Sequence, residues 1–136
     1  MRVILDNNIL FSALISRKSF PHSIYQAWRQ GLFELVTCEE QLVEIRRASR
    51  YPKFKYLLQQ HIVGTVVNNM QRAIVIKNLP SVYETADPDD AWLFALADKA
   101  QANYLVTGDK RAGILSRNNI GQTQIVTASE FCEKVL

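Results

Sequence analysis

The chain has 136 residues, 48% of them hydrophobic, which fits one globular domain with one core. Its net charge of +3 is modest, and its two cysteines, Cys38 and Cys132, lack the spacing of a zinc site, so we expect ordinary thiols. The early acid at position 6 excludes a signal-peptide core and no apolar run approaches a membrane span, so we expect a cytoplasmic protein without a membrane segment.

The first third of the chain is predicted to alternate strands with helices. Residues 2–5 form an apolar strand, followed by an apolar-rich helix that runs to about Ile15. Residues 22–30 can form a second helix. Residues 33–38 alternate enough for a strand, and residues 38–49 have helical propensity.

The middle of the chain is predicted to be mostly helical. Pro52 ends the preceding helix, because the residue before a proline is disfavoured in the helical conformation. Residues 53 to about 70 show helical patterns, with an interruption expected at Gly64. Residues 72–77 are β-branched and indicate a strand, and a loop over residues 78–88 follows.

The last third contains the clearest helix, at residues 90–102. Residues 104–107 indicate a buried strand, and residues 125–127 another strand before a C-terminal helix. Strands that alternate with helices imply a mainly parallel sheet covered on both faces. We therefore expect a single α/β domain over residues 1–136, a three-layer α/β/α sandwich with a central sheet of four to five strands.

Two aspartates follow predicted strands. Asp6 comes directly after the strand of residues 2–5, and Asp109 comes after that of residues 104–107 with one glycine between. Ligands of an open parallel α/β sheet bind beyond the carboxyl ends of its strands, so the two carboxylates share one edge if these strands are parallel neighbours. Helix N-capping is the alternative role for each aspartate.

Asp90 has a different kind of support. Asp87 can cap the helix, with the proline after it at the first helical position, which leaves Asp90 in the first turn. The residues three, four and seven positions after Asp90 are Leu93, Phe94 and Ala97. Asp90 therefore shares the apolar stripe that faces the sheet, where an ionised carboxylate needs a partner or a metal ion. We interpret Asp90 as functional rather than capping.

Glu44 lies among bases in a predicted helix, where a glutamate commonly makes exposed ion pairs. Its interest comes from the aspartates, because crowded carboxylates raise one another's pKa unless a divalent cation supplies compensating charge. Ligation by oxygen alone suits Mg²⁺ or Mn²⁺ rather than zinc. The sequence therefore predicts an acidic centre for one of these ions.

Between Glu44 and Glu84 the sequence has no acid, so this stretch is strongly basic. Its first part, residues 46–56, interleaves bases with aromatic residues, a mixture that suits phosphate contacts and base stacking. The alternative is a solvated helix face whose aromatic residues belong to the core. The residues that we expect to bind RNA are Arg46, Arg47, Arg50, Tyr51, Lys53 and Lys55.

Four short motifs occur in the order found in a known family. They are DNNILFSAL from position 6, LVEIRR from position 42, DPDDAWLFALA from position 87 and LVTGDK from position 105. With these motifs the chain resembles the PIN domain family, particularly the bacterial toxin-type branch related to VapC. The resemblance covers nearly the whole length and implies a PIN-like nuclease domain over residues 1–136.

The resemblance also implies a role for each motif. Asp6 becomes a metal ligand, with Asn8 as a supporting polar residue and Ser12 as a nearby hydroxyl. Glu44 resembles the family's helical glutamate, and the apolar pattern favours Asp90 over the aspartate before it. The implied catalytic residues are Asp6, Glu44, Asp90 and Asp109. The implied metal ligands are Asp6, Asp90 and Asp109, with Glu44 and Asp87 as further candidates.

The activity implied by the resemblance is endoribonuclease hydrolysis of RNA with one or two Mg²⁺ or Mn²⁺ ions, leaving a 5′-phosphate and a 3′-hydroxyl. Single-stranded RNA is favoured, because stacking on a tyrosine needs unstacked bases. The implied partners are the RNA, a cognate antitoxin protein and a second copy of the chain in a homodimer. Arg111 stands where many relatives carry a further acid, which leaves the second metal position open.

Two other classes of protein share some of these features. A receiver-type phosphoacceptor domain also places acids at strand ends, but it needs a pair of acids after the first strand, where this chain has Asn7 and Asn8. It also needs a lysine after a late strand, and the IVTASE segment has none. The other alternative is a PIN fold that binds RNA without cutting it, which Arg111 makes plausible.

Overall fold

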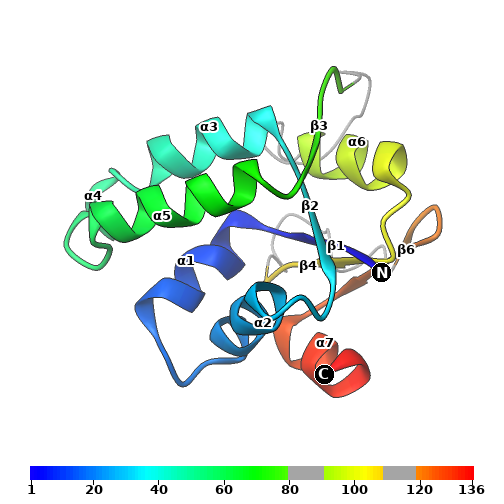
Figure 1. Cartoon of the computed structure of the whole chain (residues 1–136), viewed down its shortest axis with the longest axis horizontal. Coiled ribbons are helices and arrows are strands. Elements are labelled where there is room, and N and C mark those ends of the chain that lie inside the picture. Colours follow the sequence, from blue (N-terminus) through cyan, green and yellow to red (C-terminus); the bar gives the residue numbers. More distant parts are fainter. Residues whose placement is uncertain (80–90, 109–118) are drawn as a thin grey trace.

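The computed structural model describes residues 1–79, 91–108 and 119–136, and Figure 1 shows the course of the chain. The strands are β1 (Arg2–Leu5), β2 (Glu34–Cys38), β3 (Ile74–Ile76), β4 (Tyr104–Val106), β5 (Asn119–Ile120) and β6 (Thr123–Val126). The helices are α1 (Asn7–Ile15), α2 (Phe20–Arg29), α3 (Glu39–Ala48), α4 (Pro52–Lys55), α5 (Gln60–Gln71), α6 (Ala91–Ala100) and α7 (Ala128–Val135).

The strands form one sheet in the order β3-β2-β1-β4-β6-β5. All neighbouring strands are parallel except β5 and β6. β1 lies between β2 and β4, with Val3 opposite Leu35 and Leu5 opposite Val106. The chain continues from β1 to β2 and β3 on one side and reaches β4 and β6 on the other. The strand order therefore reverses between β1 and β4, the place where such sheets bind ligands.

Helices cover both faces of this sheet. Successive residues of a strand point to opposite faces, so Val3 and Leu5 pack in a core with α1, α2, α3, α5 and α7. Ile4 packs instead in a second core with α6. Figure 1 shows α6 and α7 on opposite sides of the strands. The predicted three-layer α/β/α sandwich with a mainly parallel sheet is confirmed.

Among the described residues the sheet has six strands rather than the four to five predicted. The unpredicted strand is β5, which pairs antiparallel with β6 through Ile120 and Thr123. Gly121 lies in the two-residue turn between them with φ of +56°, a conformation that glycine adopts without steric cost. A strand of two residues has no periodic pattern, so the sequence gives no sign of it.

Two helix boundaries also differ from prediction. α2 begins two residues early, because the Ser19 hydroxyl accepts a hydrogen bond from the backbone N–H of His22 and caps the helix. The predicted interruption at Gly64 is wrong, since Gly64 lies inside α5 and the break falls at residues 56–59. Leu58, in that break, is buried in the core, so packing rather than a breaker residue places it. No described helix is both long and apolar enough to cross a membrane.

Candidate functional site

Asp6 lies directly after β1, at the sheet edge where β4 also ends. The pairing of Leu5 with Val106 places Thr107 opposite Asp6, and the Thr107 hydroxyl donates a hydrogen bond of 2.8 Å to Oδ2 of Asp6. The Asp6 side chain makes no capping hydrogen bond to α1, which argues against the N-cap alternative. Asp6 is only 7% exposed, and a carboxylate so buried needs polar partners or a cation.

A buried amide ties α3 to the backbone on either side of Asp6. Nε2 of Gln41 donates to the backbone oxygen of Leu5 at 2.6 Å and to Oδ1 of Asn7 at 3.1 Å. Its Oε1 accepts a hydrogen bond of 2.6 Å from the hydroxyl of Thr37 in β2. This network fixes the chain that carries Asp6. Sequence reasoning missed Gln41, Thr37 and Thr107, because nothing in the sequence distinguishes a buried polar residue from a solvated one.

A cavity of about 240 Å³, which we call the acid pocket, brings Asp6 together with Glu44. Three other predicted residues, Asn8, Tyr51 and Lys53, also line it. The remaining lining residues are Asn7, Phe11, Ala48, Phe54 and Trp92. Carboxylates from the end of β1 and from α3 therefore share one opening with a base and a tyrosine.

Glu44 is held in an ion pair on the surface of α3. Its Oε2 pairs with Nη2 of Arg47, one turn later in the helix. The side chains of Arg47 and Glu44 are 59% and 25% exposed, so solvent screens the pair and its contribution to stability is below about 1 kcal/mol. Arg47, which we predicted to contact RNA, pairs with the second carboxylate, and its contact with RNA stays a prediction.

The other predicted acids cannot be placed. Asp87, Asp90 and Asp109, together with Arg111, lie outside the described residues. Asp90 directly precedes Ala91, the first residue of α6, and Asp109 directly follows Gly108. We expected Asp6 and Asp109 to share one edge of the sheet if the strands before them were parallel neighbours. Those strands, β1 and β4, are parallel neighbours.

The apolar stripe predicted for the Asp90 helix is confirmed where it is described. Leu93, Phe94 and Ala97 are buried in the core between α6 and the sheet. Trp92, near the start of the helix, lines the acid pocket. The first described turn of α6 therefore lies beside Asp6.

The donors of the acid pocket fit a hard divalent cation. Asp6 and Glu44 supply carboxylate oxygens and Asn8 an amide oxygen, the ligand type of Mg²⁺ and Mn²⁺. Within residues 1–79, 91–108 and 119–136, no three His, Cys, Asp or Glu side chains gather as a metal site.

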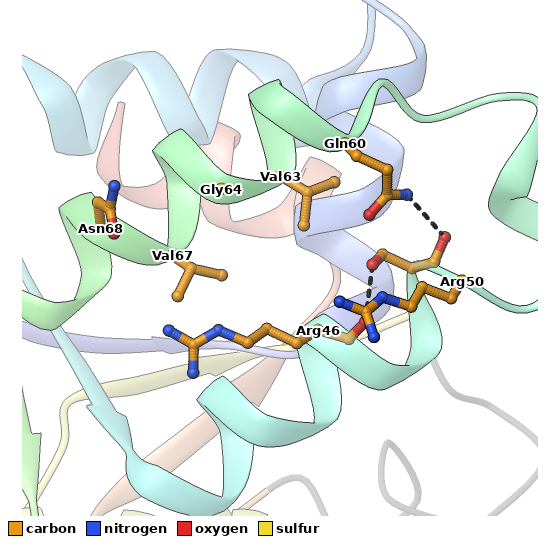
Figure 2. Close-up of a pocket in the computed structure, with 8 residues that line it drawn as sticks. Arg46, Arg50, Gln60, Val63, Gly64, Val67 and Asn68 are labelled. Carbon is orange, nitrogen blue, oxygen red and sulfur yellow. Dashed lines mark hydrogen bonds between the residues drawn. The ribbon is translucent and has the colours of Figure 1, made fainter.

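Two predicted RNA-binding arginines line a different cavity, which we call the arginine pocket. Arg46 and Arg50 border this space of about 280 Å³ between α3 and α5 (Figure 2). The other lining residues are Ser49, Gln60, Val63, Gly64, Val67 and Asn68. Ser12 and Lys55 are exposed and line neither pocket. Of the predicted basic residues, Arg46 and Arg50 therefore line the arginine pocket, Lys53 lines the acid pocket, and Arg47 and Lys55 line neither.

The aromatic residues of the basic stretch are divided too. Tyr51 and Tyr56 are 44% and 88% exposed, whereas Phe54 is buried. The ring of Phe54 packs against Phe11 with centroids 4.7 Å apart. The core alternative is therefore correct for Phe54, while Tyr51 presents its ring at the acid pocket.

Both cysteines are free thiols, as predicted. Cys38 ends β2 and is fully buried, and this burial raises the pKa of its thiol from 9.0 to about 12. Burial also raises the pKa of the Cys132 thiol. A protonated thiol is a poor nucleophile, so neither cysteine adds to the chemistry of the site.

The family model of the PIN domain matches residues 2–111. This match covers all four motifs and ends before β5, β6 and α7. No curated protein matches the chain. PIN domains are generally nucleases, and they usually use divalent metal ions.

Proposed function

The chain belongs to the PIN domain family, and from that premise we propose that it is a metal-dependent endoribonuclease that cuts RNA in the acid pocket. The observation that carries the proposal is the meeting of Asp6 and Glu44 in one cavity, at the sheet edge between β1 and β4. A base and an exposed tyrosine at the same opening fit a nucleic-acid strand better than a small neutral substrate.

We assign the cation to Asp6 and Glu44, together with Asp90, Asp109 and, as a further candidate, Asp87 by resemblance. When bound, Mg²⁺ or Mn²⁺ supplies positive charge to the phosphate and acidifies water. Thr107 acts on the site by holding Asp6 in place through its hydroxyl. This hydrogen bond orients the carboxylate in the manner of the outer partners of metal ligands.

The proposed reaction is hydrolysis of a phosphodiester. The water oxygen forms a bond to phosphorus, the bond from phosphorus to the 3′ oxygen breaks, and the 3′ oxygen takes up a proton. The products are a 5′-phosphate and a 3′-hydroxyl. Lys53 offers an ammonium group to the phosphate, and Tyr51 offers a ring on which an unstacked base can lie.

The test is cleavage of a panel of structured and unstructured RNAs by purified protein with Mn²⁺. We expect Asp6→Asn and Glu44→Gln to lose more than about 100-fold in rate. Glu133→Gln, which removes an exposed acid on α7, is the matched control and should cut like the wild type. A contaminating nuclease would not discriminate between these proteins.

Equal cleavage by the wild type and Asp6→Asn would contradict the proposal. Titration with Mn²⁺ distinguishes the non-catalytic alternative. A wild type that binds RNA, binds no Mn²⁺ and cuts nothing is an RNA-binding PIN fold rather than a nuclease.

The biological role that we propose is that of a toxin held inactive by an antitoxin encoded beside it. This proposal rests on the resemblance of the four motifs to the toxin-type branch. Expression of the chain alone should slow growth, and co-expression with the neighbouring gene should restore it. Unaffected growth in both cases contradicts the role, while the Asp6→Asn protein serves as the inactive control.

We also propose that the chain forms a homodimer, again from the resemblance. Sedimentation at several protein concentrations measures the assembly directly. A single species with the mass of one chain at all concentrations contradicts this proposal without affecting the nuclease.

A further inference from the structure

The arginine pocket is lined by two guanidinium groups that form no ion pair within the described part of the chain. Among the described residues no carboxylate pairs with Arg46 or Arg50, and no acid lines the cavity. An arginine fork has its best complement in a phosphate or carboxylate group. The amides of Gln60 and Asn68 add neutral hydrogen-bonding groups at the same opening, as Figure 2 shows.

Gly64, an exposed glycine on α5, leaves open space in this place. It lies in the middle of α5, where glycine costs about 1 kcal/mol relative to alanine. A Cβ at this position would meet no protein atom within 4 Å, so close packing does not explain the glycine. Gly64 lines the arginine pocket, where any side chain would occupy the open space.

The two pockets adjoin at the end of α3. Ala48 and Tyr51 line the acid pocket, whereas Ser49 and Arg50, between them in sequence, line the arginine pocket. Neighbouring Cα atoms are about 3.8 Å apart, so only a short ridge of chain, residues 48–51, separates the two spaces. The two spaces therefore lie on either side of this segment.

We propose that the arginine pocket binds backbone phosphates of an RNA strand that continues from the acid pocket across residues 48–51. This inference rests on the proposed function, because it assigns the strand's course beyond the point of cleavage. Arg46 and Arg50 bind the phosphates, and Gly64 leaves room for them. The exposed ring of Tyr51 lies on the acid-pocket side of the ridge.

RNA binding, measured by fluorescence anisotropy in EDTA so that nothing is cut, tests the proposal. RNAs of about 4 and about 16 nucleotides are compared, the short one filling the acid pocket and the long one reaching both. Arg46→Gln/Arg50→Gln should weaken the long RNA about tenfold and leave the short one nearly unchanged. The salt slope for the long RNA should fall by about 1.4, or about 0.7 for each lost phosphate.

Two controls separate the pocket from net charge and from folding. Arg17→Gln/Lys18→Gln removes the same charge from an exposed turn between α1 and α2 and should leave the salt slope almost intact. Arg46→Lys/Arg50→Lys keeps the charge but lacks the planar guanidinium fork. Compared with the glutamine variant, it should restore the salt slope of long-RNA binding more fully than the affinity for the long RNA.

A neutral change tests the space itself. Gly64→Gln places a side chain in the pocket and should weaken the long RNA without changing net charge. Thr65→Gln, next to it on α5 and outside the lining, is the bulk-matched control. Thermal unfolding confirms that each variant folds, and Gly64→Ala should raise the midpoint slightly.

Unchanged long-RNA binding in the arginine and Gly64→Gln variants overturns the inference, even if Asp6-dependent cleavage stands. The inference is also overturned if these variants still bind the long RNA normally but no longer bind a mononucleotide, or a protein encoded by the neighbouring gene. Conversely, if the wild type cuts no RNA but Arg46→Gln/Arg50→Gln weakens binding of the long RNA as expected, the proposed function alone is contradicted.

Discussion

The acid pocket and the arginine pocket lie on either side of the same short ridge, yet they are built differently. The acid pocket begins at the ends of β1 and β4 and is fixed by buried hydrogen bonds from Thr107 and Gln41. The arginine pocket combines exposed arginines with the buried residues Ser49, Val63 and Val67. Its hydrogen bonds run to backbone oxygens, from Ser49 to Arg46 at 2.9 Å and from Gln60 to Ser49 at 3.3 Å.

This difference shows that the fold uses one pocket to position reacting groups and the other to attract the charged strand. Chemistry on a phosphate requires groups held within a fraction of an ångström, which buried hydrogen bonds provide. Attraction of a negatively charged strand requires only positively charged side chains, which can adjust their conformation to the strand. Changes near the acid pocket should therefore alter stability and rate together, and changes in the arginine pocket should alter binding alone.

The largest effect is expected at Cys38, because the reactivity of its buried thiol reports whether water is excluded from the core between the sheet and α6. With a pKa raised from 9.0 to about 12, the thiolate fraction near pH 8 falls about 1,000-fold. Modification by a thiol reagent should therefore be slow at Cys38 and faster at the half-buried Cys132. Equal rates in the Cys38→Ala and Cys132→Ala variants would contradict a dry interior.

The same thiol predicts a pH dependence of stability. Below pH 9 it is protonated in both the folded and the unfolded chain, so its contribution is constant. Between pH 9 and about 12 the unfolded chain releases the proton and the folded chain keeps it, so the free energy of unfolding falls as pH rises. Urea unfolding across this range should show a shallower fall in Cys38→Ala than in the wild type.

Gln41→Ala, near the acid pocket, should lower the free energy of unfolding more than Gln60→Ala in the arginine pocket. It leaves buried partners on Leu5, Asn7 and Thr37 without the amide, at a cost of about 3 kcal/mol in the free energy of unfolding. Gln60→Ala, which removes the longer, part-buried hydrogen bond of the arginine pocket, should cost less than about 1 kcal/mol. Denaturant melts measure both, and similar losses would remove the contrast.

Thr107→Val tests position without removing charge. The valine keeps the shape of the side chain but cannot donate to Oδ2 of Asp6, so we expect cleavage to fall about 10–100-fold. Thr107→Ser keeps the hydroxyl and should recover most of the rate. Full activity in Thr107→Val would mean that the hydrogen bond does not position Asp6.

Tyr51→Ala should give the smallest effect, because its ring is partly exposed beside the acid pocket. Loss of one stacked base costs about 1 kcal/mol, or about fivefold in RNA affinity. Tyr51→Phe keeps the ring and should bind like the wild type. Equal weakening in both variants would assign the role to the hydroxyl instead of stacking.

The sequence was sufficient to predict the sheet core and the position of Asp6. Apolar runs at β1 and β4 are bounded by polar residues, and buried parallel strands have this pattern. The stripe of α6 was also predictable, because Leu93, Phe94 and Ala97 repeat with helical period.

What the sequence did not predict depends on tertiary contacts. The break before α5 contains neither proline nor glycine, and it follows from the burial of Leu58. Gln41 reads as a solvated helix residue until β1 and β2 are placed beside α3. The separation of Glu44 from Arg46 was within reach, because residues two apart in a helix face different directions.

The pairing of β1 with β4 joins Asp6 to Thr107 across a sequence separation of 101 residues. During synthesis Asp6 is made 101 residues before its partner. During synthesis, and during refolding, the edge of β1 stays open until the chain has closed this long loop, which is a slow event for non-local contacts. A fragment that ends before β4 therefore contains the first acid and lacks the hydrogen bond that positions it, so the pocket matures only after β4 and Thr107 have been made.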